Sequence, residues 1–172
     1  MSEIIAALLG AFAAGLIQTI LSLRTRKHET ETLLVAIAAE VDSICRLIRA
    51  QGYEHSVRET LQYLHTQDAG VTTIIVDLKA DYFTVFNGLN AQIGRLKPNQ
   101  ALKIVNFYAF CKAAIDSTRP DGIMVGEDRM DIVRGNLEIV ASLLEAILRL
   151  GDEIVQMPAT PIHGELGLID DR

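Results

Sequence analysis

The chain begins with a long run of uncharged, mostly apolar residues. The run extends from Ile4 to Leu23, reads IIAALLGAFAAGLIQTILSL, and stops at the basic residues Arg24, Arg26 and Lys27. As an α-helix, twenty residues rise about 30 Å, which is the thickness of the hydrocarbon core of a bilayer. We therefore predict a transmembrane helix and assign residues 1–28 to a membrane anchor with a basic flank.

Two other interpretations of this run fit less well. A cleaved secretory signal starts with basic residues and is followed by a small-residue cleavage site. This chain has Glu3 before the run, and the A-x-A tripeptide nearest to it, from Ala11 to Ala13, lies inside the run rather than behind it. The second alternative is a helix in the core of a soluble protein, but a chain of 172 residues offers little core in which to bury it.

The charges that flank the run predict its orientation. Lys and Arg close to a span end are retained on the cytoplasmic side, and here three basic residues follow the run while none precedes it. We expect a bacterial inner-membrane protein with its N-terminus outside and everything after Arg24 in the cytoplasm. Cys45 and Cys111 are isolated in the sequence and lie in expected helices, which favours buried free thiols in a reducing compartment over a disulfide.

The charge of the cytoplasmic part argues against one class of partner. Removing Glu3, Arg24, Arg26 and Lys27 from the totals of 22 acidic and 16 basic residues leaves 21 and 13, a net charge of −8. Proteins that bind nucleic acid depend on phosphate contacts and normally carry the opposite sign. We expect no general nucleic-acid binding, and we assign the three basic residues to the membrane surface, facing the anionic lipids of the bilayer.

Small and polar residues gather on one side of the predicted span. They recur every four positions in two adjacent rows, and the contact face that they predict comprises Ala7, Gly10, Ala11, Ala14, Gly15, Gln18, Thr19 and Ser22. Small rows allow helices to approach closely in lipid, so we predict self-association into a homo-oligomer. Two alternatives remain open. The small residues can be incidental, or the polar residues can line a water-filled path in an assembled pore.

The next segment reads as an amphipathic helix. Apolar residues from Leu33 to Ile48 keep a spacing of three and four, and Gly52 is placed to end the helix. This helix either continues the span as one rod over residues 4–50 or breaks near Lys27 and His28. Both alternatives give an anchor followed by a cytosolic helical domain, which we assign to residues 29–156.

Further helices are expected down the chain. One covers residues 56–67, and although VTTIIV at 71–76 favours a strand locally, a lone strand is unstable, so we expect a helix continuing through Phe86. Pro98 closes that region. A helix from Asn99 should bury Leu102, Val105, Phe107, Phe110, Ala113 and Ile115, and a helix over 127–154 should bury Met130, Val133, Leu137, Val140, Leu144, Ile147 and Leu150.

The fold class predicted from these patterns is all-α. A transmembrane helix precedes a cytosolic helical bundle, and the Pro- and Gly-containing residues 157–172 form a flexible tail.

One stretch resembles a known group of proteins. Residues 86–98 read FNGLNAQIGRLKP, with an Ile-Gly-x-Leu turn at Ile93 to Leu96, and the following helix contains the pair Phe107 and Tyr108. This segment resembles part of a family of small bacterial single-pass membrane proteins of unassigned function. The resemblance covers about a quarter of the chain together with the layout of an anchor and a helical domain. It implies a fold family and no chemistry.

The same layout is similar to that of small membrane proteins of bacterial phage-defence systems, including pore-forming accessory proteins that accompany RNA-guided RNA-cleaving effectors. That resemblance implies a divergent HEPN-like domain, whose hallmark is an Arg separated from a His by four to six residues. Arg58 with His65, and Arg49 with His55, have this spacing. Eleven arginines and four histidines give about one such pair by chance. The alternative assignment is therefore an ordinary surface Arg and His.

Other chemistry finds little support in the sequence. The four histidines have no helical H-x-x-x-H spacing and no neighbouring cysteine, and Gly122 to Gly126 lacks the Lys-Ser/Thr of a phosphate loop. We expect no metal, no cofactor and no enzymatic activity. The leading hypothesis is a homo-oligomeric scaffold or accessory protein of the inner membrane, whose cytosolic domain binds itself or a partner protein. The alternative is a membrane-disrupting or pore-forming effector of an antiviral defence system.

Overall fold

The described part of the chain consists of helices and contains no strand. A computed structural model describes residues 2–66, 80–118 and 130–158, with the side chains in these ranges except those of residues 2–14, 16, 66, 80, 81 and 130. The elements are α1 (Ser2–Ala50), α2 (Tyr53–Thr66), the 3₁₀ helix η1 (Ala80–Phe83), α3 (Thr84–Leu89), the 3₁₀ helix η2 (Asn90–Arg95), α4 (Pro98–Thr118) and α5 (Met130–Val155). The expectation of an all-α fold is confirmed for these residues.

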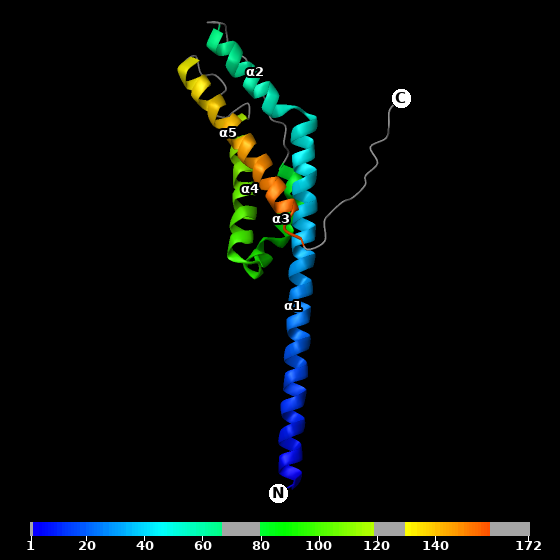
Figure 1. Cartoon of the computed structure of the whole chain (residues 1–172). Helices are drawn as coiled ribbons and strands as arrows, with labels where there is room; N and C mark the ends of the chain where they lie inside the picture. The colour runs from blue at the N-terminus through cyan, green and yellow to red at the C-terminus, as the bar shows by residue number, and fades with distance from the viewer. Residues whose placement is uncertain (1, 67–79, 119–129, 159–172) are drawn as a thin grey trace, which may run out of the picture.

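A single helix links the N-terminus to the core. α1 contains 49 residues without interruption, a length of about 74 Å at 1.5 Å per residue. Its N-terminal half projects from the molecule, and its C-terminal half lies among the other helices (Figure 1). We call residues 30–50 of α1, together with α2 to α5, the helical body. Of the two alternatives left open by the sequence, the continuous rod is correct and the break near Lys27 is not.

The end of α1 follows from one glycine. Gly52 has φ +64°, a left-handed conformation that a side chain disfavours, and its N–H donates to the carbonyl of Arg49 at 3.1 Å. The carbonyl of Gly52 in turn accepts from the N–H of Ser56 at 3.0 Å, inside α2. The helix end at Gly52 is as predicted, whereas α2 starts at Tyr53, three residues before the expected residue 56.

α5 is the central helix of the body, because it packs against α4, α1 and α2. Its buried residues follow the expected spacing and include Val133, Leu137, Val140, Leu144, Ile147, Leu150 and Ile154. The side chain of Met130, which was expected on this face, lies outside the described residues. α5 meets α1 and α4 at Gly151, where an added Cβ would lie 2.2 Å from Cys45 Sγ and 3.3 Å from Phe107 Cε2.

α1 and α2 contribute the faces that the sequence predicted. The buried residues of α1 include Leu33, Leu34, Ile37, Val41, Ile44 and Ile48. In α2, Val57 and Leu64 are fully buried and Leu61 is half-buried. The guanidinium of Arg134 in α5 donates to the carbonyl of Leu64 near the end of α2, which gives one of the last carbonyls of that helix a partner.

Residues 80–97 form a compact connection at one end of the body. Helical structure at Ala80–Phe83 and Thr84–Leu89 agrees with the expected helix through Phe86, whereas the VTTIIV segment lies outside the described residues. α4 then starts at Pro98, a residue suited to the first helical position. The N–H of Lys97 just before it donates to Gln100 Oε1 at 3.2 Å, the reverse half of a capping box.

The face predicted for α4 is partly wrong. Phe107 and Ile115 are buried and Phe110 is half-buried, but Leu102 and Val105 are 59 % and 45 % exposed and Ala113 is also exposed. The buried face consists of Ile104, Phe107, Tyr108, Cys111, Ala114, Ile115 and Thr118. This helix is apolar on more than one side, so its period alone does not select the face that α5 covers.

The chain beyond α5 continues along the body for a short distance. Met157 packs partly against the core and Pro158 is buried, so the start of the predicted flexible tail is held in place. Residues 159–172 of that tail lie outside the described residues.

Candidate membrane anchor and its junction with the helical body

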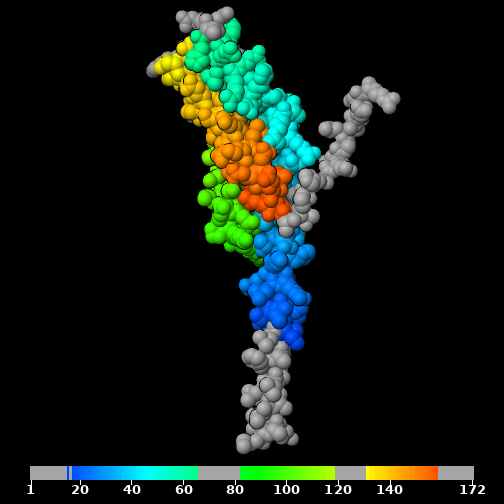
Figure 2. All heavy atoms as spheres, viewed as in Figure 1, coloured from blue at the N-terminus to red at the C-terminus, as the bar shows by residue number. Residues whose placement is uncertain are grey.

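The projecting part of α1 exposes large apolar side chains. Ile17, Ile20, Leu21 and Leu23 are 51 to 59 % exposed, and the coloured part of this segment in Figure 2 stands clear of the helical body. Successive residues of a helix are rotated by 100°, so these side chains point to several sides. Exposing these side chains to water costs roughly 25 cal/mol for each Å² of apolar area. This segment is therefore a candidate for burial in lipid or against another protein.

The residues expected to form the small face are described only in part. Gly15, Gln18, Thr19 and Ser22 are exposed, and an added Cβ at Gly15 would meet nothing within 4 Å. The side chains of Ala7, Gly10, Ala11 and Ala14 lie outside the described residues. Among the residues whose side chains the structure describes, no helix has both the length and the apolarity to cross a membrane. Residues 4–14 and 16 of the predicted span are not in that set.

The hydroxyl groups of this segment bond within their own helix. Thr19 donates to the carbonyl of Gly15 at 2.8 Å, Ser22 to that of Thr19 at 2.9 Å, and Thr25 to that of Leu21 at 3.1 Å. These hydroxyl protons therefore need no water or partner chain, which makes the segment compatible with an apolar environment.

A basic segment follows the apolar one. Arg24, Arg26 and Lys27 are all exposed, and the only ion pair that the described residues provide here joins Lys27 Nζ to Glu31 at 3.9 Å. This pair is exposed and separated by one helical turn, so it contributes little to stability. The basic segment keeps its positive charge available at the base of the body.

The connection after α3 brings a further arginine to this base. Arg95 Nη1 at the end of η2 donates to Glu29 Oε2 at 3.1 Å, and both side chains are about half-exposed. The two residues are 66 positions apart in the chain. Sequence reasoning missed this contact because nothing local in the sequence places residue 95 beside residue 29.

The most developed polar cluster within the body surrounds Glu40, which sequence reasoning did not single out. Glu40 accepts hydrogen bonds from the backbone N–H groups of Val85 at 2.6 Å and Phe86 at 3.0 Å, and from the hydroxyl of Tyr108 at 2.6 Å. The carboxylate thus satisfies two donors at the start of α3, which has no side-chain cap of its own. Both oxygens of Glu40 accept hydrogen bonds from residues of α3 or α4. The carboxylate therefore links α1 to these two helices, and the role of the cluster is structural.

Aromatic contacts reinforce the same junction. The ring of Tyr108 stacks on Phe86 with centroids 3.9 Å apart and meets Phe83 and Phe107 edge-on at 5.5 and 5.2 Å. Burial, followed by the hydrogen bond to Glu40, raises the pKa of Tyr108 well above its usual range. The Phe-Tyr pair noted in the sequence therefore forms part of the core.

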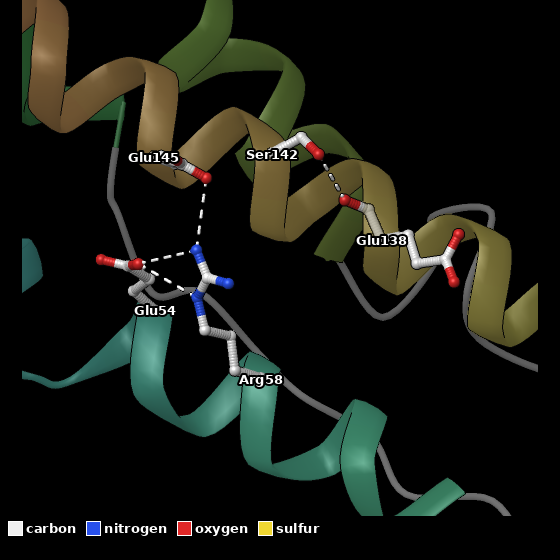
Figure 3. A network of polar contacts seen from close by, with 5 residues as sticks. All are labelled: Glu54, Arg58, Glu138, Ser142 and Glu145. Carbon is white, nitrogen blue, oxygen red and sulfur yellow. Dashed lines mark hydrogen bonds and ion pairs between the residues drawn. The ribbon is translucent and has the colours of Figure 1, made fainter. Parts of the chain in front are cut away.

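The arginines of the two HEPN-like candidate pairs form ion pairs with acidic residues. Arg58 is held between two carboxylates, with Nε donating to Glu54 at 3.1 Å and Nη2 to Glu145 at 3.2 Å (Figure 3). His65 is exposed near the end of α2. In the second pair, Arg49 forms a bidentate contact to Asp152 at 2.7 and 2.9 Å, and His55 lies 3.9 Å from Glu59. These contacts favour the alternative assignment as surface residues.

The two cysteines are free and buried, as expected. Burial raises the pKa of Cys45 to about 12 and also raises that of Cys111, so both thiols are protonated near neutral pH. Neither thiol is therefore activated as a nucleophile or as a metal ligand. Within the described ranges, no group of His, Cys, Asp and Glu is arranged to hold a metal ion.

Comparison with known proteins adds no relative. No protein-family model, curated protein or solved structure matches this chain. The described residues form an all-helical body with a projecting N-terminal helix.

Proposed function

We propose that this protein is a homo-oligomeric scaffold or accessory subunit of the bacterial inner membrane. In this proposal the first half of α1 spans the bilayer once with its N-terminus outside, and the helical body lies in the cytoplasm, where it binds its copies or a partner protein. The basic segment Arg24, Arg26 and Lys27 lies at the inner leaflet.

One observation carries the proposal: a continuous helix leaves the helical body and exposes apolar residues that no described part of the chain covers. Ile17, Ile20, Leu21 and Leu23 are each more than half exposed. The charge-free sequence from Ile4 to Leu23 supports a lipid environment for the whole segment. A helix continuous with the core would transmit the position of the span directly to the helical body.

The self-association part of the proposal depends on the small face of the span. Gly15 has open space around it, so a second helix could approach its backbone closely. The internal hydrogen bonds of Thr19 and Ser22 support a packed helix contact over a water-filled path, because the hydroxyl protons are already bound. For this reason we propose the scaffold over the pore-forming effector.

The first experiment tests the membrane location. The full-length chain is expressed in bacteria, and its membranes are washed with high salt and then with alkaline carbonate. We expect the protein to stay in the membrane pellet until detergent is added, because a span of about 20 apolar residues is not extracted by salt or pH. Release of the protein into the aqueous fraction without detergent would refute the proposal.

The second experiment tests self-association. Changing Gly10 and Gly15 to Leu adds bulk to the small face, and at Gly15 an added Cβ would meet nothing within 4 Å. Ala13→Leu is the matched control, since residue 13 is rotated about 160° from residue 15 on a helix. We expect the double variant to lose the oligomer in detergent, measured by light scattering, while the control retains it. An unchanged oligomer in the double variant would contradict the predicted interface.

Dye release separates the two functional hypotheses. Liposomes that contain the reconstituted full-length chain should retain an encapsulated dye if the protein is a scaffold. Release that is abolished by the Gly10 and Gly15 changes would instead support the pore-forming effector.

A further inference from the structure

A cavity lies at the base of the helical body, where α1 leaves it. Its volume is about 340 Å³, and it is lined by Arg26, Glu29, Thr30 and Arg95. Three of these residues come from consecutive turns of α1, and the fourth comes from the end of η2. Figure 1 shows that the connection between α3 and α4 lies at the end of the body that faces the projecting half of α1.

The charges around this cavity favour an anion. Two guanidinium groups and one carboxylate line it, which gives a net charge of +1. Arg95 donates to Glu29 Oε2 through Nη1 only. The other N–H groups of this guanidinium are not used in the ion pair with Glu29. Among the described residues Arg26 has no acidic partner, and Thr30 donates its hydroxyl to the carbonyl of Arg26. Arginine is suited to phosphate because its planar donors bind two oxygens at once.

The distance of the cavity from the end of the apolar run corresponds to the depth of the lipid headgroup layer. Residues rise about 1.5 Å each, so the level between Arg26 and Glu29 lies about 5 to 9 Å beyond Leu23, the last residue of the apolar run. The polar headgroup layer of each leaflet is about 5 to 8 Å thick. A cavity at this level faces lipid phosphates whenever the apolar run spans the bilayer.

We propose that this cavity binds the phosphate group of an anionic phospholipid of the inner leaflet. The site extends the membrane contact from the anchor to the helical body, because Arg95 belongs to a segment remote from the span in sequence. Lipid binding would therefore fix how the body stands on the membrane. This inference rests on the proposed single-pass anchor, and its chemistry is that of a phosphate with one net negative charge.

The test measures lipid binding to the full-length chain in detergent by native mass spectrometry during titration with phosphatidylglycerol. Arg26→Gln and Arg95→Gln each remove one cationic donor from an exposed position. We expect each to weaken phosphatidylglycerol binding about tenfold, since a direct hydrogen bond between charged groups contributes at least about that factor. Arg95→Lys should recover part of the loss. Zwitterionic phosphatidylcholine should bind the unaltered chain more weakly than phosphatidylglycerol.

The matched control is Lys27→Gln. Lys27 is exposed, adjacent to Arg26 and at the same depth, but it does not line the cavity. We expect less than a twofold effect from this change. Equal losses in Lys27→Gln and Arg95→Gln would show diffuse attraction to the basic segment, and wild-type binding by Arg95→Gln would show that the cavity takes no lipid. Either result would overturn the inference.

Two further measurements distinguish a lipid phosphate from a free phosphate and test the membrane anchor separately. Inorganic phosphate added at millimolar concentration should leave the phosphatidylglycerol bound, whereas displacement that depends on Arg95 would assign the cavity to a free phosphate and overturn the lipid assignment. Membrane fractionation of the unaltered chain tests the anchor by itself. If the chain stays in the membrane but Arg95→Gln has no effect on lipid binding, this inference fails while the proposed function stands.

Discussion

The contact at Gly151 gives a sharp test of how the three long helices pack. Replacing Gly151 by Ala would place a Cβ 2.2 Å from Cys45 Sγ, 3.3 Å from Phe107 Cε2 and 3.5 Å from Val41 Cγ1. Heavy atoms in contact normally lie about 3.5 to 4.0 Å apart. Cys45 is 1 % exposed, so its sulfur is enclosed by the core and cannot turn out into solvent.

Two opposing effects set the size of the change. Forcing an extra methyl group into a packed core costs about 1 to 3 kcal/mol, and the large overlap with Cys45 favours the upper part of that range. Alanine in place of a helical glycine contributes about 0.5 to 1 kcal/mol in the other direction. We therefore expect Gly151→Ala to lower the free energy of unfolding by about 1 to 2 kcal/mol, which lowers Tm by roughly 2 to 8 °C for a chain of this size.

Gly135→Ala is the matched control, because residue 135 lies in the same helix and an added Cβ there meets nothing within 4 Å. It should raise stability by about 0.5 to 1 kcal/mol. The assay is thermal unfolding of the full-length chain in detergent, followed by far-ultraviolet circular dichroism.

A double-mutant cycle identifies the cause. Cys45→Ala removes the sulfur that the new Cβ would meet, so in that background Gly151→Ala should cost at least about 1 kcal/mol less. A Gly151→Ala variant as stable as the original chain, or costs that simply add in the double variant, would refute the packing described for α1, α4 and α5.

Three further predictions follow from the same core and surface. Burial keeps Cys45 and Cys111 protonated in the folded chain at pH values where unfolded thiols, with a pKa near 8.5, lose their protons. The free energy of unfolding, measured by urea titration, should therefore fall as pH rises from about 9 toward 12, by at most about 1.4 kcal/mol per pH unit for each thiol. Cys111→Ala should flatten this slope, and an unchanged slope would contradict the raised pKa of the buried thiol. Glu40→Gln leaves one acceptor oxygen for three donors and should cost about 1 to 3 kcal/mol by thermal unfolding, so a variant of unaltered Tm would count against the junction. Arg58→Ala should cost less than about 1 kcal/mol, because its ion pairs are exposed. Together with His65→Ala it should leave any RNA-dependent phenotype unchanged, and loss of such a phenotype in a folded variant would instead support a functional HEPN-like pair.

The comparison of α4 and α5 explains why sequence patterns predict some faces and not others. α5 has one apolar side, and its predicted buried residues from Val133 to Leu150 are confirmed. α4 has apolar residues on several sides, and the sequence pattern predicted that Leu102 and Val105 are buried. Both are exposed in the structure. A period locates a buried face only when the opposite face is polar.

The candidate sites divide in a similar way. The exposed apolar segment of α1 and the basic residues after it could be identified from residues adjacent in the chain. Glu40 could not be identified in this way, because its partner Tyr108 lies 68 positions away. An acidic residue on a helix is normally exposed to solvent, so nothing in the sequence marks this one as buried. The cavity at Arg95 depends in the same way on a contact across 66 positions.

Local sequence patterns identify the apolar run and its basic flank, the helices that follow, the helix end at Gly52 and a new helix from about Asn99. These features depend on periodicity, charge and backbone preference over a few neighbouring residues. The three-dimensional packing of the helices was needed to establish that α1 runs unbroken into the core, which face of α4 is buried, and that Gly151 has no room for a side chain. Those outcomes depend on how helices distant in the chain fill the space between them, and no local pattern encodes that fit.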